Sequence, residues 1–200
     1  NIFMEELTLI LTENELDFKT FKLCNLTGSQ IVSFDVEIDK ETALISYETL
    51  EKFRNKGYAS KGLNMLKDFL FNHDNILFLE LINLSGDYSR KVAENAGFFS
   101  RSGNLDYYVL LNPLAEQILN DRLNFLDVSS VKYKKTHQLL DKVKKLRQVE
   151  FFSKQKMKAK LDELLQQREV VDSGDYKEYI ESEINHLQKV LIDSQDIKKL

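Results

Sequence analysis

The stretch ISYETLEKFRNKGYASK, residues 45–61, decides the fold. Its first three residues have the β-branched and aromatic composition of a strand, and a basic loop with a glycine follows. Leu63, Leu66 and Leu70 then recur at helical spacing. The backbone N–H groups at the start of such a helix have no partner inside the helix, and the helix dipole adds partial positive charge there. A strand that runs through a basic loop into a helix therefore predicts a site for a pyrophosphate group.

The loop residues suit an anion in two ways. Gly57 and Ala59 are small, so a bulky anion can come close to the backbone N–H groups. Arg54, Lys56 and Lys61 add full positive charges. The same residues also fit an ordinary turn between a strand and a helix, with a solvated basic rim. The loop alone does not separate these two interpretations.

Outside this stretch, strand-like and helix-like segments alternate as far as residue 112. Strands are expected at residues 7–11, 17–24, 31–38, 43–50, 76–82, 98–101 and 105–111, and helices at 60–71 and about 87–96. The segment 76–82 is apolar except for Glu80, which suits a strand buried on both faces. Gly97 is a natural left-handed end for the second helix. Residues 1–112 are therefore predicted to form an α/β (α+β) domain, in which helices flank a mixed, mostly antiparallel sheet.

The remainder, residues 113–200, is almost purely helical in pattern. Asn112-Pro113 is a good helix start, with Asn as the N-cap and Pro at the first helical position. A long helix is expected at about residues 130–168. Asp175 and Glu178 resemble a capping box that begins a last helix.

The charges of the two long helices are opposite. Residues 132–160 carry a net charge of +9, and residues 161–200 carry a net charge of −5. An antiparallel, coiled-coil-like hairpin would bring these charges together while it buries the Leu and Ile stripe. We expect this hairpin to serve a homodimer or a protein partner. Binding of nucleic acid is less favoured, because the basic residues lie all around the helix rather than on one face.

Several classes of site and location are not indicated. Cys24 is the sole cysteine and lies in a strand-like run, so a buried structural thiol is expected rather than a disulfide or a zinc ligand. The three histidines are far apart, and no metal site is expected. No stretch approaches the roughly 20 apolar residues of a membrane span, and no export signal is seen. We expect a cytoplasmic protein.

Two motifs resemble those of the GNAT superfamily of N-acetyltransferases. The segment RNKGYA, residues 54–59, matches the pyrophosphate-binding signature Q/R-x-x-G-x-G/A. The segment SRKVAENAGF, residues 89–98, is similar to the second signature of the ribosomal-protein and small-molecule branch, S-x-x-V-A-x-x-x-G-F. The motifs stand in the family's order with a buried strand between them, and the resemblance covers roughly residues 18–112.

The resemblance implies that acetyl-CoA is the cosubstrate and that an acceptor amine attacks its thioester directly in a ternary complex. The implied coenzyme-binding residues are Thr49, Leu50, Glu51, Arg54, Asn55, Lys56, Gly57, Tyr58, Ala59 and Ser60. Because the attacking amine must be neutral, a carboxylate often accepts its proton. Glu48 is the first candidate for this base and Glu80 the second.

This sequence departs from the family at three places. Ala93 stands where many members carry the Tyr that protonates the departing thiolate, and Gly86 stands where an Asn is common. Ser89 or Tyr88 can replace the missing donor. The two helices that usually separate the first two strands, and that build much of the acceptor site, have no room here. A weakly catalytic or non-catalytic interaction module is therefore the alternative function, and the acceptor is not predicted.

Overall fold

The computed structural model describes residues 6–73, 75–82, 84, 86–101 and 106–196. The strands are β1 (Thr8–Asn14), β2 (Phe18–Cys24), β3 (Gln30–Asp39), β4 (Thr42–Thr49), β5 (Phe78–Ile82), β6 (Phe99–Ser100) and β7 (Tyr107–Leu111). The helices are η1 (Glu51–Phe53, one 3₁₀ turn), α1 (Tyr58–His73), α2 (Gly86–Asn95), α3 (Ala115–Asn124), α4 (Val131–Val170) and α5 (Asp175–Asp196). The elements expected in residues 1–112 are confirmed within a few residues, and the turn expected at 102–104 lies outside the described residues.

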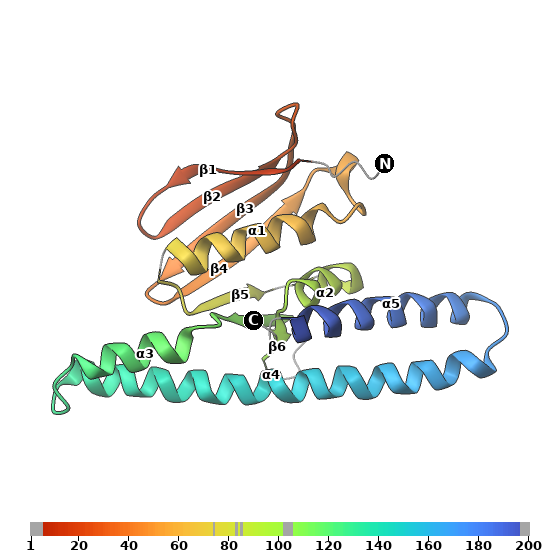
Figure 1. Ribbon diagram of the computed structural model, residues 1–200. Coiled ribbons are helices and arrows are strands. Elements are labelled where there is room, and N and C mark those ends of the chain that lie inside the picture. Colours follow the sequence, from red (N-terminus) through yellow and green to blue (C-terminus); the bar gives the residue numbers. More distant parts are fainter. Residues whose placement is uncertain (1–5, 74, 83, 85, 102–105, 197–200) are drawn as a thin grey trace.

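The seven strands form one mixed sheet in the order β1-β2-β3-β4-β5-β7-β6 (Figure 1). Strands β4 and β5 run parallel, and the other neighbouring strands run antiparallel. The parallel pairing extends from Thr42 opposite Phe78 to Ile45 opposite Leu81, whereas β4 continues to Thr49. The two strands therefore separate beyond Ile45. This arrangement confirms the predicted mixed, mostly antiparallel sheet with flanking helices.

One face of the sheet packs against α1 and α2. Leu63, Leu66 and Leu70 of α1 are fully buried in the same cluster as Phe21 and Phe34 of the sheet. The helix α2 ends where expected, since Gly97 has a φ of 94° and its N–H donates to the Glu94 carbonyl. This cluster is the larger core of the molecule.

The opposite face of β5, β7 and β6 packs against α3 and α4. Phe78 and Leu111 of the sheet share a second core with Leu119 of α3 and Val143 of α4. β5 contributes Phe78 to this core and Leu79 to the first core, so the prediction that β5 is buried on both faces is confirmed. Figure 1 shows α3 and α4 as a layer beneath this part of the sheet. The C-terminal helices are therefore part of the folded core.

The same face of β2 and β3 carries polar side chains. Lys22 Nζ donates to Ser33 Oγ (2.7 Å), and Thr20 Oγ1 donates to Asp35 Oδ1 (3.1 Å). Polar side chains of the neighbouring strands β2 and β3 thus form hydrogen bonds with one another. This surface has the composition of a sheet that faces water on one side.

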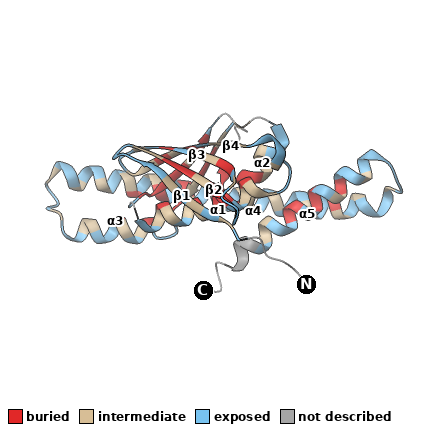
Figure 2. Ribbon diagram, turned by 90° about the horizontal axis from the view of Figure 1, so that it is seen from above, coloured by how far each residue is buried: buried red, intermediate tan, exposed pale blue. Residues whose placement is uncertain are grey.

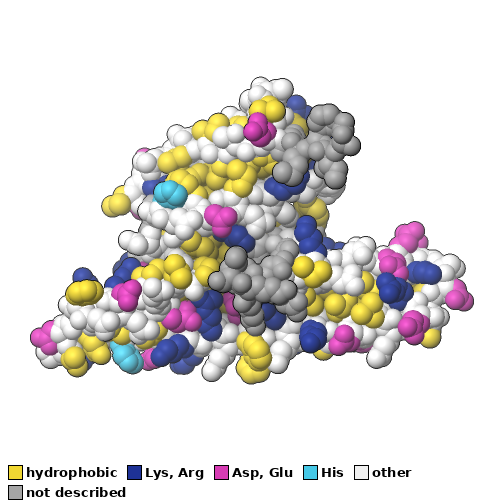
Figure 3. Space-filling model, in the orientation of Figure 1, with side chains coloured by type: hydrophobic (Ala, Val, Ile, Leu, Met, Phe, Trp, Pro, Cys, Tyr) yellow, Lys and Arg dark blue, Asp and Glu magenta, His cyan; other side chains and the backbone are white. Residues whose placement is uncertain are grey.

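The long helices α4 and α5 pack together as an antiparallel pair (Figure 1). Ile180, Ile184 and Leu187 of α5 are buried and share a cluster with Leu164 of α4, so α5 has one buried side (Figure 2). The expected pairing of opposite charges occurs between Lys160 and Glu183 (3.7 Å) and between Arg168 and Glu181 (3.7 Å). On the face shown in Figure 3, positive and negative side chains are interspersed along this helical layer.

Two helix starts differ from the sequence expectation. α3 begins at Ala115 rather than at Pro113, because the Asn112 side chain makes a local turn by accepting from the Leu114 N–H (3.0 Å) and also donates to the Ile76 carbonyl. α5 begins at Asp175 itself, and the Gly174 carbonyl accepts its first helical hydrogen bonds. Asp175 is therefore the first helical residue, one position past the N-cap that the expected capping box requires.

Candidate functional site

The predicted phosphate loop lies between the end of β4 and the start of α1. The chain leaves β4 at Thr49, makes the η1 turn and reaches Gly57, whose carbonyl accepts from the Lys61 N–H (3.2 Å). Asn55 and Gly57 both have a positive φ, 63° and 82°. A Cβ built on Gly57 meets no atom within 4 Å, so the space in front of the α1 N-terminus is open. The first turn of α1 carries no acidic residue that would compete with an anion.

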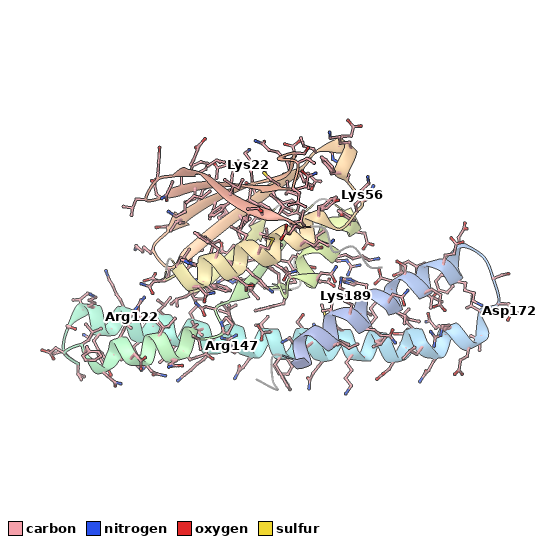
Figure 4. All side chains as sticks on the ribbon, turned by 45° about the horizontal axis from the view of Figure 1, so that its top comes forward. Lys22, Lys56, Arg122, Arg147, Asp172 and Lys189 are labelled. Atoms are coloured by element: carbon pink, nitrogen blue, oxygen red, sulfur yellow. The ribbon has the colours of Figure 1, made fainter. Side chains whose placement is uncertain are left out.

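Side chains of the loop hold its backbone in place. Arg54 Nε donates to the Thr49 carbonyl (3.0 Å), which ties the loop to the end of β4. The rings of Phe53 and Tyr58 meet edge to face at 5.8 Å. Lys61 Nζ lies 5.7 Å from the Tyr58 ring, and Lys56 is exposed on the loop (Figure 4). Cationic side chains thus surround the N-terminus of α1. The Arg54 hydrogen bond and the contact between Phe53 and Tyr58 hold the loop in front of it in place.

Most of the residues predicted to bind the coenzyme follow one another around this loop. Leu50 and Glu51, together with Lys52, line a shallow hollow of about 530 Å³ where β4 ends. The Leu50 N–H donates to the Ile31 carbonyl, so the backbone at the strand end is partly committed to β3. Ala59 is buried against the first core, whereas Ser60 is half-buried in the first turn of α1.

A second cavity of about 380 Å³ lies where β4 and β5 separate. Side chains from both faces of the sheet line it: Glu37, Leu44, Ser46 and Ile82 from one face, and Ile45, Tyr47 and Leu81 from the other, with Leu84 and Ser89 beside them. Side chains of both sheet faces therefore line the cavity at the point where the two strands separate.

Ser89 and Tyr47 are brought together in this cavity. Ser89 stands on α2 and lines this cavity together with Tyr47. Burial raises the pKa of Tyr47 and outweighs the opposing effect of the nearby Ser89 side chain. The phenol therefore stays protonated and can act as a hydrogen-bond donor. The sequence analysis treated Tyr47 only as a strand residue, although the alternation along β4 places it on the same face as Ile45.

The position of Ser89 matters because Ala93 replaces the Tyr that many GNAT sequences carry at that place. Ala93 is fully buried in the first core and provides no hydroxyl group. Ser89 lies four residues earlier on the same helix, and residues at this spacing share a helix face. A hydroxyl group is therefore present on that face of α2, one turn closer to its N-terminus.

The two candidate bases lie on the polar face of the sheet. Glu48 follows Tyr47 and points to the opposite face. Its side chain is 82% exposed and lies 3.9 Å from Arg54. Glu80 of β5 lies near the Tyr107 hydroxyl, which accepts from Arg101 Nη1 (3.1 Å). Neither carboxylate touches Ser89, so base and donor candidates occupy opposite sides of the opening.

A buried charge cluster links the candidate site to the C-terminal helix. Arg90, next to Ser89 on α2, lies 2.9 Å from Glu94 and 3.3 Å from Glu183 of α5. Glu94 is 5% exposed and also contacts His186 Nε2 at 2.8 Å. Lys91 lies 3.0 Å from Glu183, which is 1% exposed. No sequence pattern indicates this cluster, because its residues lie on two helices far apart in the chain.

Comparison with known proteins gives a structural likeness. No protein-family model and no curated protein matches the chain. Among solved structures it is similar to ribosomal-protein-S5-alanine acetyltransferase from Vibrio fischeri, with a TM-score of 0.43 and 14% identity. It is also similar to a probable acetyltransferase, with a TM-score of 0.41 and 24% identity. Each alignment covers 48% of this chain and 63% of the other. Over about half its length the chain resembles GNAT acetyltransferases.

A third similar structure is RimL, a ribosomal L7/L12 alpha-N-protein acetyltransferase in complex with coenzyme A. Its TM-score is 0.40 at 17% identity, and the alignment covers 47% of this chain and 62% of that one. The GNAT-like part of the present chain joins β1 to β2 through residues 15–17, so no helix separates these strands. The remainder of the chain forms the C-terminal helices.

Two further searches of the described residues concern metals and membranes. No group of three or more His, Cys, Asp or Glu side chains in the described ranges is arranged to hold a metal ion. None of the helices described is both long and apolar enough to cross a membrane. Cys24 is buried at the end of β2, which agrees with a structural thiol.

Proposed function

We propose that the chain is an N-acetyltransferase that transfers the acetyl group of acetyl-CoA to an amine. The observation that carries this proposal is the glycine loop between β4 and α1, placed beside the opening between β4 and β5. A loop with open backbone N–H groups suits a pyrophosphate. A cavity reached from both sheet faces suits a direct reaction between two bound molecules. The identity of the amine remains outside the proposal.

The loop residues fit the phosphate end of the coenzyme. Gly57 leaves open the space in front of the α1 N-terminus that a Cβ would enter, and Lys56 and Arg54 add positive charge beside it. We assign pyrophosphate binding to the backbone of residues 54–60 and the adjacent arm to Thr49, Leu50 and Glu51. Acetyl-CoA supplies the thioester that the amine attacks.

The chain's own residues provide two proton-handling groups in this proposal. Glu48, or Glu80 through the polar face, takes the proton of the incoming amine. Ser89, which lines the cavity beside Tyr47, donates to the sulfur that leaves. The base and the donor thus act from opposite faces of the sheet, as the lining of the opening permits.

Calorimetric titration with acetyl-CoA, and with coenzyme A for comparison, tests the cofactor assignment. We expect micromolar binding by the native chain and a loss of at least about tenfold in Gly57→Glu, whose side chain enters the phosphate space. Gly28→Glu is the matched control, because Gly28 also has a positive φ (80°) and open surroundings. Normal binding by Gly57→Glu would show that the loop assignment is wrong.

The second candidate function is an interaction module with little or no activity. Ala93 in place of the usual Tyr, and the 82% exposure of the Glu48 side chain, favour it. Tight binding of acetyl-CoA without thiol release across a panel of amines would support this alternative. Thiol release with any amine would support the enzyme.

A further inference from the structure

A wide basic cleft lies at the end of the molecule where α3 turns into α4. Its volume is about 830 Å³, and its walls come from the turn between β3 and β4, from the C-terminal end of α3, and from the first three turns of α4. It is lined by Lys40, Glu41, Arg122, Phe125, Leu126, Lys132, Lys135, Thr136, Gln138, Leu139 and Lys142. The predicted phosphate loop lies elsewhere, since Figure 4 shows Arg122 near the left end of the molecule and Lys56 well to its right.

Positive charge dominates this cleft although the whole chain is acidic. Five of its lining residues are Lys or Arg and only Glu41 is acidic, whereas the chain has a net charge of −4. Glu41 already forms an ion pair with Arg122 (3.9 Å). Lys142 Nζ lies over the Phe78 ring, 4.6 Å from its centroid. Within the described part of the chain, Lys132 and Lys135 form no ion pair. The cleft therefore holds uncompensated positive charge.

The start of α4 adds to this potential. The N-terminus of a helix carries partial positive charge, and acidic residues are favourable there. The first turn of α4 contains no acidic residue, yet Lys132, Lys134 and Lys135 stand within its first five positions. This arrangement costs stability in the absence of an anion. Local rules of this kind are broken mainly where function requires it.

The cleft also has an apolar part. Phe125 is 91% exposed at the end of α3, and Leu126 and Leu139 lie close by in the lining. An exposed aromatic ring next to clustered cations favours a ligand that has a flat apolar group as well as negative charge. We propose that this cleft binds a small organic anion that carries several phosphates and a planar group.

Titration with ATP in the absence of metal, and with inorganic tripolyphosphate, tests this proposal. The double variant Lys132→Glu/Lys135→Glu should weaken the binding of both anions by about tenfold or more, because it reverses two charges in the cleft. The same variant should be at least as resistant to heat as the native chain, because acidic residues suit this helix end. Loss of binding then cannot be attributed to unfolding. Lys144→Glu/Lys145→Glu, on an exposed part of α4, is the matched control and should bind normally.

Two further variants separate this site from others. Phe125→Ala should reduce the affinity for ATP to that for tripolyphosphate. Gly57→Glu, whose phosphate loop is blocked, should bind ATP in the cleft as the native chain does, so this result is independent of the acetyltransferase proposal. Equal weakening by the control pair, or unchanged binding by Lys132→Glu/Lys135→Glu, would overturn the proposal. Tighter binding of a 20-nucleotide RNA than of ATP would also overturn it, in favour of a nucleic-acid surface.

Discussion

Gly62 lies on the buried side of α1, where the helix passes very close to the sheet. A Cβ at this position would stand 2.7 Å and 2.9 Å from two atoms of the Phe34 ring. Since glycine is unfavourable inside a helix by up to about 1 kcal/mol relative to alanine, its presence here follows from this close approach. It allows α1 to lie flat on β3 and brings the start of the helix to the phosphate loop.

Gly62→Ala should therefore destabilise the protein in spite of alanine's better helix propensity. Overpacking costs about 1–3 kcal/mol, so we expect a net loss of roughly 1 kcal/mol and a decrease in Tm of about 2–4 °C. Thermal unfolding followed by circular dichroism measures this. The double variant Gly62→Ala/Phe34→Leu relieves the clash and should recover part of the loss. A Tm equal to or above the native value would contradict the packing argument.

The position of Tyr47 beside Ser89 could not be predicted from the sequence, because a strand pattern indicates the face of a side chain but not its neighbour on α2. Tyr47→Phe removes the hydroxyl that contacts Ser89 and keeps the ring. If the pair donates to the leaving sulfur, turnover should fall by roughly tenfold to a hundredfold while acetyl-CoA binding stays unchanged. Thiol release and calorimetry on the same variant separate the two effects. Tyr179→Phe, on an exposed part of α5, is the control, and an equal loss there would argue against the pair.

At the scale of elements, the regular spacing of hydrophobic residues explains why the strands and helices of residues 1–112 are predictable from the sequence. Leu63, Leu66 and Leu70 indicate one buried face of α1, and the run at 76–82, which is apolar except for Glu80, indicates a strand buried on both faces. This spacing does not indicate which distant helix or strand packs against each face. Arg90 and Glu183 are 93 positions apart, and each resembles an ordinary surface charge on its own helix. Their pairing, and with it the contact between α5 and α2, therefore had to come from the structure.

The α2–α5 contact should make stability depend on pH through Glu94. Burial raises the pKa of this carboxyl, but the hydrogen bonds and charges of His186 and Arg90 outweigh burial and lower it. The Tyr108 hydroxyl also faces it. A carboxyl whose pKa is lower in the folded than in the unfolded state stabilises the fold above its unfolded pKa. This contribution is lost as the pH falls through the folded pKa.

Urea unfolding at a series of pH values between 7 and 3 measures this dependence. Glu94→Gln should be less stable than the native chain at pH 7, and the difference should shrink as the solution becomes acidic. Glu48→Gln, which changes an exposed carboxylate, should leave the profile nearly parallel to that of the native chain. A constant difference between Glu94→Gln and the native chain at all pH values would show that Glu94 does not titrate with unfolding.

At the scale of the whole molecule, the C-terminal helices complete the core rather than extend from it. Phe78, Val109 and Leu111 are each 1% exposed because α3 and α4 cover them. A chain that ends at residue 112 would expose this second core, so we expect it to aggregate and to bind a hydrophobic dye. Soluble yield and dye fluorescence measure this. A chain that ends at residue 172 keeps α3 and α4 and should stay soluble with a lower Tm, whereas a soluble, cooperatively unfolding 1–112 fragment would contradict the shared core.

The contact between α2 and α5 also orders events during synthesis. Arg90 leaves the ribosome 93 residues before Glu183, which at ordinary rates of translation is an interval on the order of 5 to 20 seconds. Throughout that interval the helix that carries Ser89 has no partner for its charged side, and Glu94 stays hydrated. The helix acquires its support only after α5 has been translated. A product truncated before α5 therefore has the loop between β4 and α1 but lacks the support for the other wall of the opening.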